Sequence, residues 1–471
     1  MKTHYRAGRA RRAVSVCKLA ASLALLWAAL AHPGAARAQA GFVDPSFLNN
    51  LSGPNSWVWA LARQPDGRLL VGGQFTSFNG VPGGEVLRLN ADGGVDTNFT
   101  ALITAGETTI HSVAVQPDGR VLIGGMFTGI NGTTRLRLAR LNADGSLDSN
   151  FVASVDSSQS FITVSHLALQ TNSQIVIAGW FETADGAPHT NIARLNPDGS
   201  LDTGYNAQID TPPNALALQV DGRVLIGGAF STVNGQTQPH IARLNTNGTL
   251  DGTFLPVTDG NVDSFAPQPD GKIVIGGGFT MVNGTGRNRI ARLNANGTLD
   301  TTFQNGMAGA DNYVNCVAVD PAGRVIVGGQ FAAMNGAGRT NLARLNSDGS
   351  LDTNFLADVD SFPEQMLVQP DSRVIIEGSY ITTVNGRSRN RLARLQSSNA
   401  PVISQPRLFG GIFSFDVNAV AGGAYGVEAS TNLPAGWSLV LSTNAAVDNF
   451  TYSDPNAAQF PRRFFRVYKS P

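Results

Sequence analysis

Short runs of alternating apolar and polar residues recur along most of the chain, and tight turns separate them. Residues 110–151 show the pattern clearly. Val113–Gln116, Arg120–Phe127 and Leu138–Asn142 alternate with the two-residue period of a half-buried strand, and Ser146–Phe151 follows as a fourth run. The connections contain Pro-Asp-Gly, Asn-Gly and Ala-Asp-Gly, which favour tight β-turns. The pattern therefore predicts a four-stranded antiparallel meander.

Two motifs show that this unit repeats at intervals near 50 residues. Asp-x-x-Phe or Asp-x-x-Tyr begins at Asp44, Asp96, Asp148, Asp202, Asp251, Asp300 and Asp352. Gly-Gly-x-Phe, or a variant of it, ends at Phe75, Phe127, Phe181, Phe230, Phe279, Phe331 and Tyr380. Such a period is typical of propellers and solenoids, and a solenoid needs atypical capping repeats at its ends.

The two ends of the repeat region complement each other. The last repeat lacks its own Asp-x-x-Phe, whereas the segment Phe42–Phe47 carries a spare copy. We therefore predict an all-β fold: a seven-bladed β-propeller of four-stranded antiparallel blades, closed by the N-terminal strand.

An arginine precedes the motif aspartate by eight residues in six repeats. The pairs are Arg88/Asp96, Arg140/Asp148, Arg194/Asp202, Arg243/Asp251, Arg292/Asp300 and Arg344/Asp352. A three-residue turn would place each pair directly opposite on neighbouring strands. The seventh arginine is Arg394, so we predict that it pairs with Asp44 across the closure. Identical pairs in every repeat indicate a structural role, because catalysis needs one asymmetric site.

The ends of the chain predict export and a second domain. Residues 1–38 have the basic start, the apolar run Leu19–Ala31 and the Ala36-Arg37-Ala38 cleavage site of a signal peptide. We expect a secreted protein, in the extracellular space, on the cell surface or in the periplasm. Residues 39–397 would form the propeller, 398–402 a linker, and 403–471 a small C-terminal β-module of sandwich-like fold.

Charge and composition limit the classes of partner that the protein is expected to bind. The whole chain has 34 basic and 34 acidic residues, but seven of the basic ones lie in residues 1–38. The acidic balance of the remainder argues against nucleic acid, which needs a basic face. No other segment has the apolar length of a membrane span. Cys316 is the one cysteine beyond the signal peptide, so an intrachain disulfide is not expected. We expect a monomer.

The repeats resemble the delta-60 repeat, the repeat of the DUF5122-type β-propeller family of secreted bacterial proteins. The resemblance is carried by Gln-Pro-Asp-Gly-Arg/Lys, Gly-Gly-x-Phe, Ala-Arg-Leu-Asn and Asp-Gly-Ser-Leu-Asp-x-x-Phe, as in Gln116–Phe151 and Gln268–Phe303. It covers residues 42–397 and implies the propeller fold, without catalytic residues to transfer. The tail is similar to a small C-terminal β-module of secreted bacterial proteins, through Ser430–Leu433, Asp454-Pro455 and Arg462–Arg466.

Length variation marks the face where function is expected. The distance from each motif aspartate to the first strand of the next blade varies between 17 and 22 residues, whereas the other distances are almost constant. Loops tolerate such variation and carry function. The same face should hold a ring of unlike side chains, each five residues before the end of the first strand. These candidate binding residues are Trp59, His111, Ser165, Asn214, Asp263, Asn315 and Glu364.

Three functions are compatible with this ring. We favour a non-enzymatic protein that binds or scaffolds extracellular polysaccharide or protein through the interblade-loop face. The alternative is an extracellular polysaccharide lyase or hydrolase at the channel mouth, which would need two nearby carboxylates or a metal-bound base. A purely architectural role is the third. The sequence identifies no catalytic residue.

We expect no cofactor and assign no metal ligand. Two weaker alternatives stay open. Asp259–Asp263 has the opening spacing of a calcium loop, although the loop lacks the glycine at its sixth place and ends at Asp270 instead of glutamate. His111 and His166 could share a metal ion with Asp263.

Overall fold

The computed structural model describes residues 17–18, 40–44, 46–48, 51–397, 402–409, 412–418, 424–431, 438–444, 449–454, 456, 459 and 463–469. Most of the predicted signal peptide and of the predicted linker lie outside these residues. The chain divides into a larger unit, Pro45–Thr353 with Ala357–Leu395, and a smaller unit that holds the remainder. No helix among the described residues is long and apolar enough to cross a membrane.

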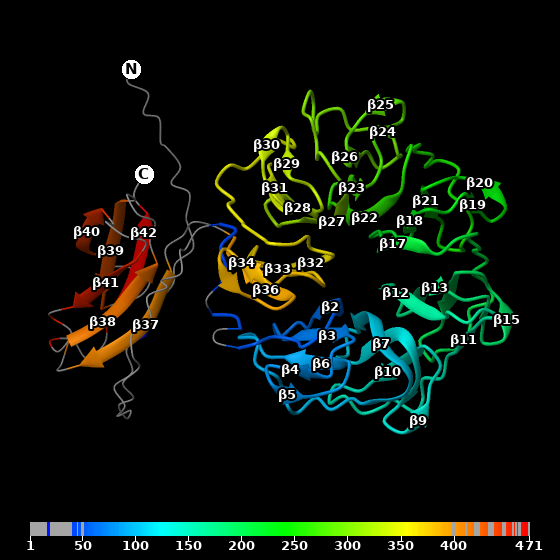
Figure 1. Cartoon of the computed structure of the whole chain (residues 1–471), viewed down its shortest axis with the longest axis horizontal. Coiled ribbons are helices and arrows are strands. Elements are labelled where there is room, and N and C mark those ends of the chain that lie inside the picture. The colour runs from blue at the N-terminus through cyan, green and yellow to red at the C-terminus, as the bar shows by residue number, and fades with distance from the viewer. Residues whose placement is uncertain are drawn as a thin grey trace, which may run out of the picture. The chain divides into compact units, whose positions relative to one another are not determined.

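The larger unit consists of antiparallel three-stranded sheets arranged around a ring, the architecture of a β-propeller (Figure 1). We number these blades 1 to 7 along the chain. The inner strands, which contact one another around the centre, are β2 (Val58–Arg63), β7 (Ile103–Val115), β12 (Thr163–Leu169), β17 (Pro213–Leu218), β22 (Val262–Pro267), β27 (Val314–Val319) and β32 (Gln365–Val368).

The middle and outer strands follow the same order around the ring. The middle strands are β3 (Leu69–Gly73), β8 (Val121–Ile130), β13 (Ile175–Trp180), β18 (Val224–Gly228), β23 (Ile273–Gly277), β28 (Val325–Gly329) and β33 (Val374–Glu377). The outer strands are β6 (Val86–Leu89), β10 (Leu138–Leu141), β16 (Ile192–Leu195), β21 (Ile241–Leu244), β26 (Ile290–Leu293), β31 (Leu342–Leu345) and β36 (Leu392–Leu395). Middle and outer strands are almost fully buried because sheets cover both of their faces.

Short ribbons at the Asn-Gly turns, and at Asp185-Gly186 in blade 3, connect the middle and outer strands. They are β4 (Ser77–Phe78) with β5 (Val81–Pro82), β8 with β9 (Thr133–Thr134), β11 (Val155–Asp156) with β14 (Thr183–Ala184) and β15 (Ala187–Pro188), β19 (Thr232–Val233) with β20 (Gln236–Thr237), β24 (Met281–Val282) with β25 (Thr285–Gly286), β29 (Ala333–Met334) with β30 (Ala337–Gly338), and β34 (Thr383–Val384) with β35 (Arg387–Ser388). Asn131 and Gly132 have φ of 48° and 77°, which fits the type I′ turn predicted there.

The fourth strand of each predicted blade is shorter than the sequence pattern indicates. In blade 2 it makes a single antiparallel bridge, Leu147 with Leu141. Asp148 explains why the ladder ends. Its carboxylate accepts a hydrogen bond from the N–H of Asn150 at 3.0 Å, and its carbonyl accepts one from the N–H of Phe151 at 3.3 Å. These bonds turn the backbone away from the sheet. The blades are therefore three-stranded sheets with a bridged fourth segment, not full four-stranded sheets.

The predicted arginine–aspartate pairs form in all six repeats, at N–O distances between 2.6 and 2.8 Å. Arg243 illustrates the contacts of these guanidinium groups. Its guanidinium lies 4.4 Å from the centre of the Phe254 ring and donates from Nη1 to the carbonyl of Ala295 in the next blade at 2.6 Å. The corresponding bond to a carbonyl of the next blade is made by Arg88, Arg140, Arg194 and Arg292. These five pairs thus join two strands and tie one blade to the next.

The aspartate of the first pair, Asp96, is held ionised. Burial raises the pKa of Asp96, but hydrogen bonds from the Asn98 N–H and from Arg68 and Arg88 outweigh it and lower the pKa to about 2.

Blades 7 and 1 make the same kind of contact as consecutive blades. Arg394 of blade 7 lies 4.7 Å from the ring centre of Phe47 and donates to the carbonyl of Ala91 in blade 1 at 2.8 Å. Inner strands β32 and β2 contact each other, as Figure 1 shows. In the smaller unit, Gln396 exchanges backbone hydrogen bonds with Gly41 and Phe42. The pairing of Asp44 with Arg394 stays a prediction.

The smaller unit contains two antiparallel sheets. One has the order β37 (Val402–Phe409), β38 (Ile412–Asn418) and β41 (Asn449–Asp454); the other has the order β1 (Cys17–Lys18), β42 (Phe464–Lys469), β39 (Ala424–Ser430) and β40 (Ser438–Asn444). Both sheets contribute to one buried cluster, to which β38 gives Phe415 and β42 gives Phe465, with ring centroids 5.3 Å apart.

Candidate functional site

The residues predicted to line the channel mouth occupy a special place in the backbone. In blade 1, Val58 pairs with Gly73 and Ala60 pairs with Gly72, so Trp59 has no partner across the ladder. The same β-bulge occurs in blades 1 to 6, at Trp59, His111, Ser165, Asn214, Asp263 and Asn315. Glu364 immediately precedes β32, the inner strand of blade 7. Bulges re-aim a side chain and are frequent beside binding sites.

The Gly-Gly pair opposite the bulge, which is Ala178-Gly179 in blade 3, makes this geometry feasible. A Cβ on Gly73 would lie 2.1 Å from the carbonyl oxygen of Trp57, and a Cβ on Gly329 would lie 2.2 Å from that of Tyr313. The first glycine serves packing between blades, since a Cβ on Gly72 would lie 2.5 Å from Ile110 of blade 2. The motif therefore shapes the mouth.

The structure brings the predicted residues together in neighbouring pairs. Trp59 and His111 have ring centroids 4.8 Å apart. Asn214 donates from Nδ2 to Asp263 Oδ1 at 2.6 Å. His166, one residue after Ser165, donates from Nε2 to the carbonyl of Asn214 at 3.0 Å. His111 Nδ1 lies 2.7 Å from Thr163 Oγ1 of blade 3, so polar and aromatic contacts run from blade 1 to blade 5.

The two histidines of this ring are neutral at physiological pH. Burial lowers the pKa of His111 to about 4, and the nearby His166 adds to the effect. Burial also lowers the pKa of His166 to about 4, against a hydrogen bond to Asn214 that raises it. In the described part of the chain, no three His, Cys, Asp or Glu side chains come together as they would around a metal ion.

The Asp259–Asp263 segment has a structural explanation. Asp259 accepts hydrogen bonds from the N–H groups of Thr280 and Met281, both at 2.7 Å. Asp311 makes the corresponding bonds to Ala332 and Ala333 in the next blade, at 2.9 and 3.1 Å. The calcium-like spacing thus coincides with a cap that recurs in blade 6 and fixes the loop before the inner strand.

Exposed aromatic side chains gather at the same end of the blades, where inner strands begin and middle strands finish. Trp57 precedes β2 and lies 5.5 Å from Trp59, centroid to centroid. Phe161 and Trp180 in blade 3 are each 49% exposed and lie 6.5 Å apart. The exposed members of the set are Trp57, Phe161, Trp180, Tyr313 and Tyr380. We call this end the mouth face. Of the aromatics at this end, only Trp59 was predicted from the sequence. Trp57 and Tyr313 stand directly before inner strands and Phe161 stands two residues before β12, all in the longer loops.

A family model confirms what the repeats indicate. The model described as "Domain of unknown function (DUF5122) beta-propeller" matches residues 64–99, 116–151, 170–205, 219–254, 268–303, 321–355 and 369–398, which is more than half of the chain. The chain belongs to the DUF5122 β-propeller family. The resemblance to this repeat family is thereby confirmed. No curated protein matches the chain.

Solved structures that resemble this DUF5122 protein are distant in sequence. The WD40 β-propeller domain of Doa1 is 15% identical, with a TM-score of 0.46, and the match covers 73% of this chain and 94% of that one. The extracellular domain of a hybrid two-component system from B. thetaiotaomicron is 11% identical, with a TM-score of 0.42, covering 90% and 54%. The GH74 xyloglucanase from Xanthomonas campestris is 12% identical, with a TM-score of 0.41, covering 79% and 59%.

The last DUF5122 repeat departs from the others at the mouth face. The sequence motif aligns Tyr380 with the buried phenylalanines, but Tyr380 is 61% exposed and Ile381 is fully buried in its place. Ile381 accepts the backbone hydrogen bond from Arg391 that Phe331 accepts from Asn341 in blade 6. The expectation for Tyr380 was wrong because the inserted residue of this repeat lies before the aromatic position.

Glu377 stands where the other repeats have the first glycine or alanine of the Gly-Gly pair. It pairs with Leu392, as Gly328 pairs with Leu342. Glu377 is completely buried, and neither of its carboxyl oxygens has a hydrogen-bond partner among the described residues. Burial raises the pKa of Glu377 well above its ordinary value, and repulsion from Glu364 adds to the rise. Glu364 itself accepts a hydrogen bond from Ser379 Oγ at 2.6 Å.

Replacing Glu377 with glutamine is expected to stabilise the protein at alkaline pH. The folded-state pKa of this carboxyl is raised, so its titration does not change the free energy of unfolding below the unfolded-state pKa of about 4.3. As pH rises from there toward the folded-state pKa, the free energy of unfolding falls. We expect Glu377→Gln to add about 1–3 kcal/mol at pH 8 and little at pH 4. Urea unfolding at both pH values measures this, and an equal difference at pH 4 and pH 8 would show that the carboxyl does not titrate as described.

Proposed function

We propose that this chain is a secreted, non-enzymatic protein that binds extracellular polysaccharide through the mouth face. The observation that carries the proposal is the set of exposed aromatic side chains there, some of them in pairs, beside the polar residues of the bulges. Exposed apolar side chains that lie together on a soluble protein mark interaction sites. Their flat apolar faces match the C–H faces of sugar rings, whereas a polar rim suits the hydroxyl groups.

The bulge residues supply the acceptors that such a ligand needs. Asp263 Oδ2 and Asn315 Oδ1 are buried and have no hydrogen-bond partner among the described residues. Burial raises the pKa of Asp263, against the hydrogen bond from Asn214 that lowers it. A sugar hydroxyl that donates to these oxygens would satisfy them. The site residues of the proposal are therefore Trp59, His111, Ser165, Asn214, Asp263, Asn315 and Glu364, together with the exposed aromatics.

The geometry favours binding over hydrolysis. A hydrolase would use two carboxylates on either side of one bond. Asp263 is engaged with Asn214, and Glu364 is engaged with Ser379 on a different part of the ring. The aromatic set also favours polysaccharide over a protein partner, the two ligands that the sequence left equally open.

We further propose how the rest of the chain serves this role. Residues 1–38 direct export, the segment around Phe42–Phe47 completes blade 7 and closes the ring, and residues 403–471 fold as a β-sandwich. The contact of Phe47 with Arg394 supports the closure, and the shared buried cluster of the two C-terminal sheets supports the sandwich.

The proposal predicts that Trp57→Ala weakens polysaccharide binding at least tenfold. Aromatic anchors at binding sites typically cost about 2 kcal/mol or more when truncated, and 1.4 kcal/mol is a tenfold change in affinity. Affinity gel electrophoresis through a panel of neutral and acidic polysaccharides measures the effect.

Two controls bracket this result. Trp57→Phe keeps an aromatic face and should retain most of the retardation. Val220→Ala removes an exposed side chain from the turn between β17 and β18, at the opposite end of the blades, and should bind as the parent does. If the parent is retarded and Trp57→Ala is retarded equally, the mouth face is not the binding surface.

A further inference from the structure

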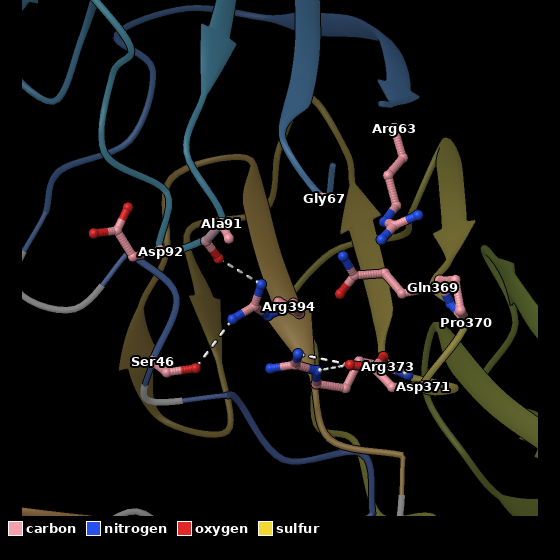
Figure 2. A pocket seen from close by; sticks show the side chains of 10 residues that line it. All are labelled: Ser46, Arg63, Gly67, Ala91, Asp92, Gln369, Pro370, Asp371, Arg373 and Arg394. Atoms are coloured by element: carbon pink, nitrogen blue, oxygen red, sulfur yellow. Dashed lines mark hydrogen bonds and ion pairs between the residues drawn. The ribbon is translucent and has the colours of Figure 1, made fainter. Parts of the chain in front are cut away.

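A second candidate site lies at the junction of blades 7 and 1, at the end of the strands opposite to the mouth face. It is a pocket of about 480 Å³ lined by turns and strand ends of both blades (Figure 2). Blade 1 contributes Arg63, Gly67, Ala91 and Asp92; blade 7 contributes Gln369, Pro370, Asp371, Arg373 and Arg394; and Ser46 completes the lining. Three guanidinium groups against two carboxylates give this pocket an excess of positive charge.

Two of the three arginines have partners within the protein that explain why an arginine stands at their positions. Arg394 donates to the carbonyl of Ala91 at 2.8 Å and to Ser46 Oγ at 3.0 Å, as the dashed lines in Figure 2 show. Arg373 forms an ion pair with Asp371 at 2.6 Å. The remaining carboxylate, Asp92, accepts a hydrogen bond from the N–H of Gly94 at 2.9 Å within its own turn. These groups belong to the framework of the blades.

Arg63 has no such explanation. The other six blades place an apolar residue at its position: Val115, Leu169, Leu218, Pro267, Val319 and Val368. Its Nε is buried, and no hydrogen bond or ion pair engages it within the described residues. Other arginines, such as Arg137 and Arg289, also have a buried Nε without a partner among the described residues. What sets Arg63 apart is its place in the repeat, where the other blades show that an apolar residue suffices for the fold.

We propose that this junction pocket binds an oxyanion, a carboxylate, sulfate or phosphate group, and that Arg63 is its anchor. A guanidinium offers a planar fork of donors that matches the two oxygens of such a group. The ligand is either a small free anion or the acidic group of a sugar, and both present the same oxygens to Arg63. The junction pocket is separate from the mouth face, so this proposal does not depend on polysaccharide binding at the mouth face.

The experiment titrates the purified protein with inorganic sulfate, inorganic phosphate and D-glucuronate at constant ionic strength, held with sodium chloride. We expect saturable binding of at least one probe by calorimetry and a matching rise in the unfolding temperature. Arg63→Leu gives blade 1 the residue found in blades 3 and 4, so it should fold, and it should weaken binding at least tenfold. Tighter binding of glucuronate than of the inorganic ions would identify a sugar acid, whereas the reverse would identify a free anion.

Two controls make the outcome decisive. Trp57→Ala, on the mouth face, should bind the probes as the parent does. Arg120→Leu removes an arginine of blade 2 whose side chain is 40% exposed, and it should leave affinity unchanged. The proposal is overturned if no probe binds saturably, or if Arg63→Leu binds as tightly as the parent.

Discussion

Phe47→Ala is expected to lower the free energy of unfolding by about 3–5 kcal/mol, the usual cost of truncating a buried phenylalanine. Phe47 is completely buried although it lies within a few residues of the predicted cleavage site. It belongs to one apolar cluster with Ile375 and Leu392 of blade 7 and with Leu89 of blade 1. A terminal segment that merely lay on the surface would tolerate the change at little cost.

The matched control is Phe254→Ala. Phe254 is also completely buried and lies beneath Arg243 within an uninterrupted stretch of chain, as Phe47 lies beneath Arg394. Urea unfolding should give similar losses for the two variants. A loss below about 1 kcal/mol for Phe47→Ala, beside a full loss for Phe254→Ala, would mean that the N-terminal segment does not complete blade 7.

Arg243→Met is expected to destabilise the protein by about 3–5 kcal/mol, because it leaves a buried carboxylate without its closest cation. The Arg243 side chain is 2% exposed and pairs with Asp251 at 2.8 Å. The same guanidinium donates to Ala295 of the next blade. The substitution therefore removes an ion pair, an interblade hydrogen bond and a cation–π contact together.

Arg223→Met provides an internal comparison, since Arg223 contacts the same carboxylate. Its Nη1 lies 2.9 Å from Asp251 Oδ2, but its side chain is 32% exposed. Exposed ion pairs contribute about 0–1 kcal/mol, so this variant should lose little stability. Equal losses for the two arginines in denaturant unfolding would contradict the view that burial at the blade junction, and not charge pairing alone, makes the repeated arginine essential.

The repeat made most of the propeller predictable from the sequence. The pairing of Arg243 with Asp251 was predictable because a separation of eight residues and a short turn fix which residues lie opposite each other. The same separation gave the correct pair in every repeat that has both residues. The fourth strand was overestimated because apolar alternation does not reveal how Asp148 bends the backbone through its own side chain. The last blade was misaligned because Tyr380 matched the motif by residue type, whereas burial selects Ile381.

The sequence could show which place in the repeat the candidate residues share, but not what kind of backbone that place has. Counting from the repeat located Trp59 and its counterparts, yet the sequence does not show that they are bulge residues, because a bulge is a property of pairing between strands. The exposed aromatics were overlooked because an apolar residue before a strand looks like core until its exposure is known. Glu377 and Arg63 could have been found by asking which repeat breaks its own pattern.

A crystal structure with the oligosaccharide of the polysaccharide that retards the protein most strongly would test the central proposal most directly. The account predicts a sugar ring stacked on Trp57 or Trp59, with hydroxyl groups donating to Asp263 or Asn315. Sugar density elsewhere on the protein, with the mouth face empty, would contradict it.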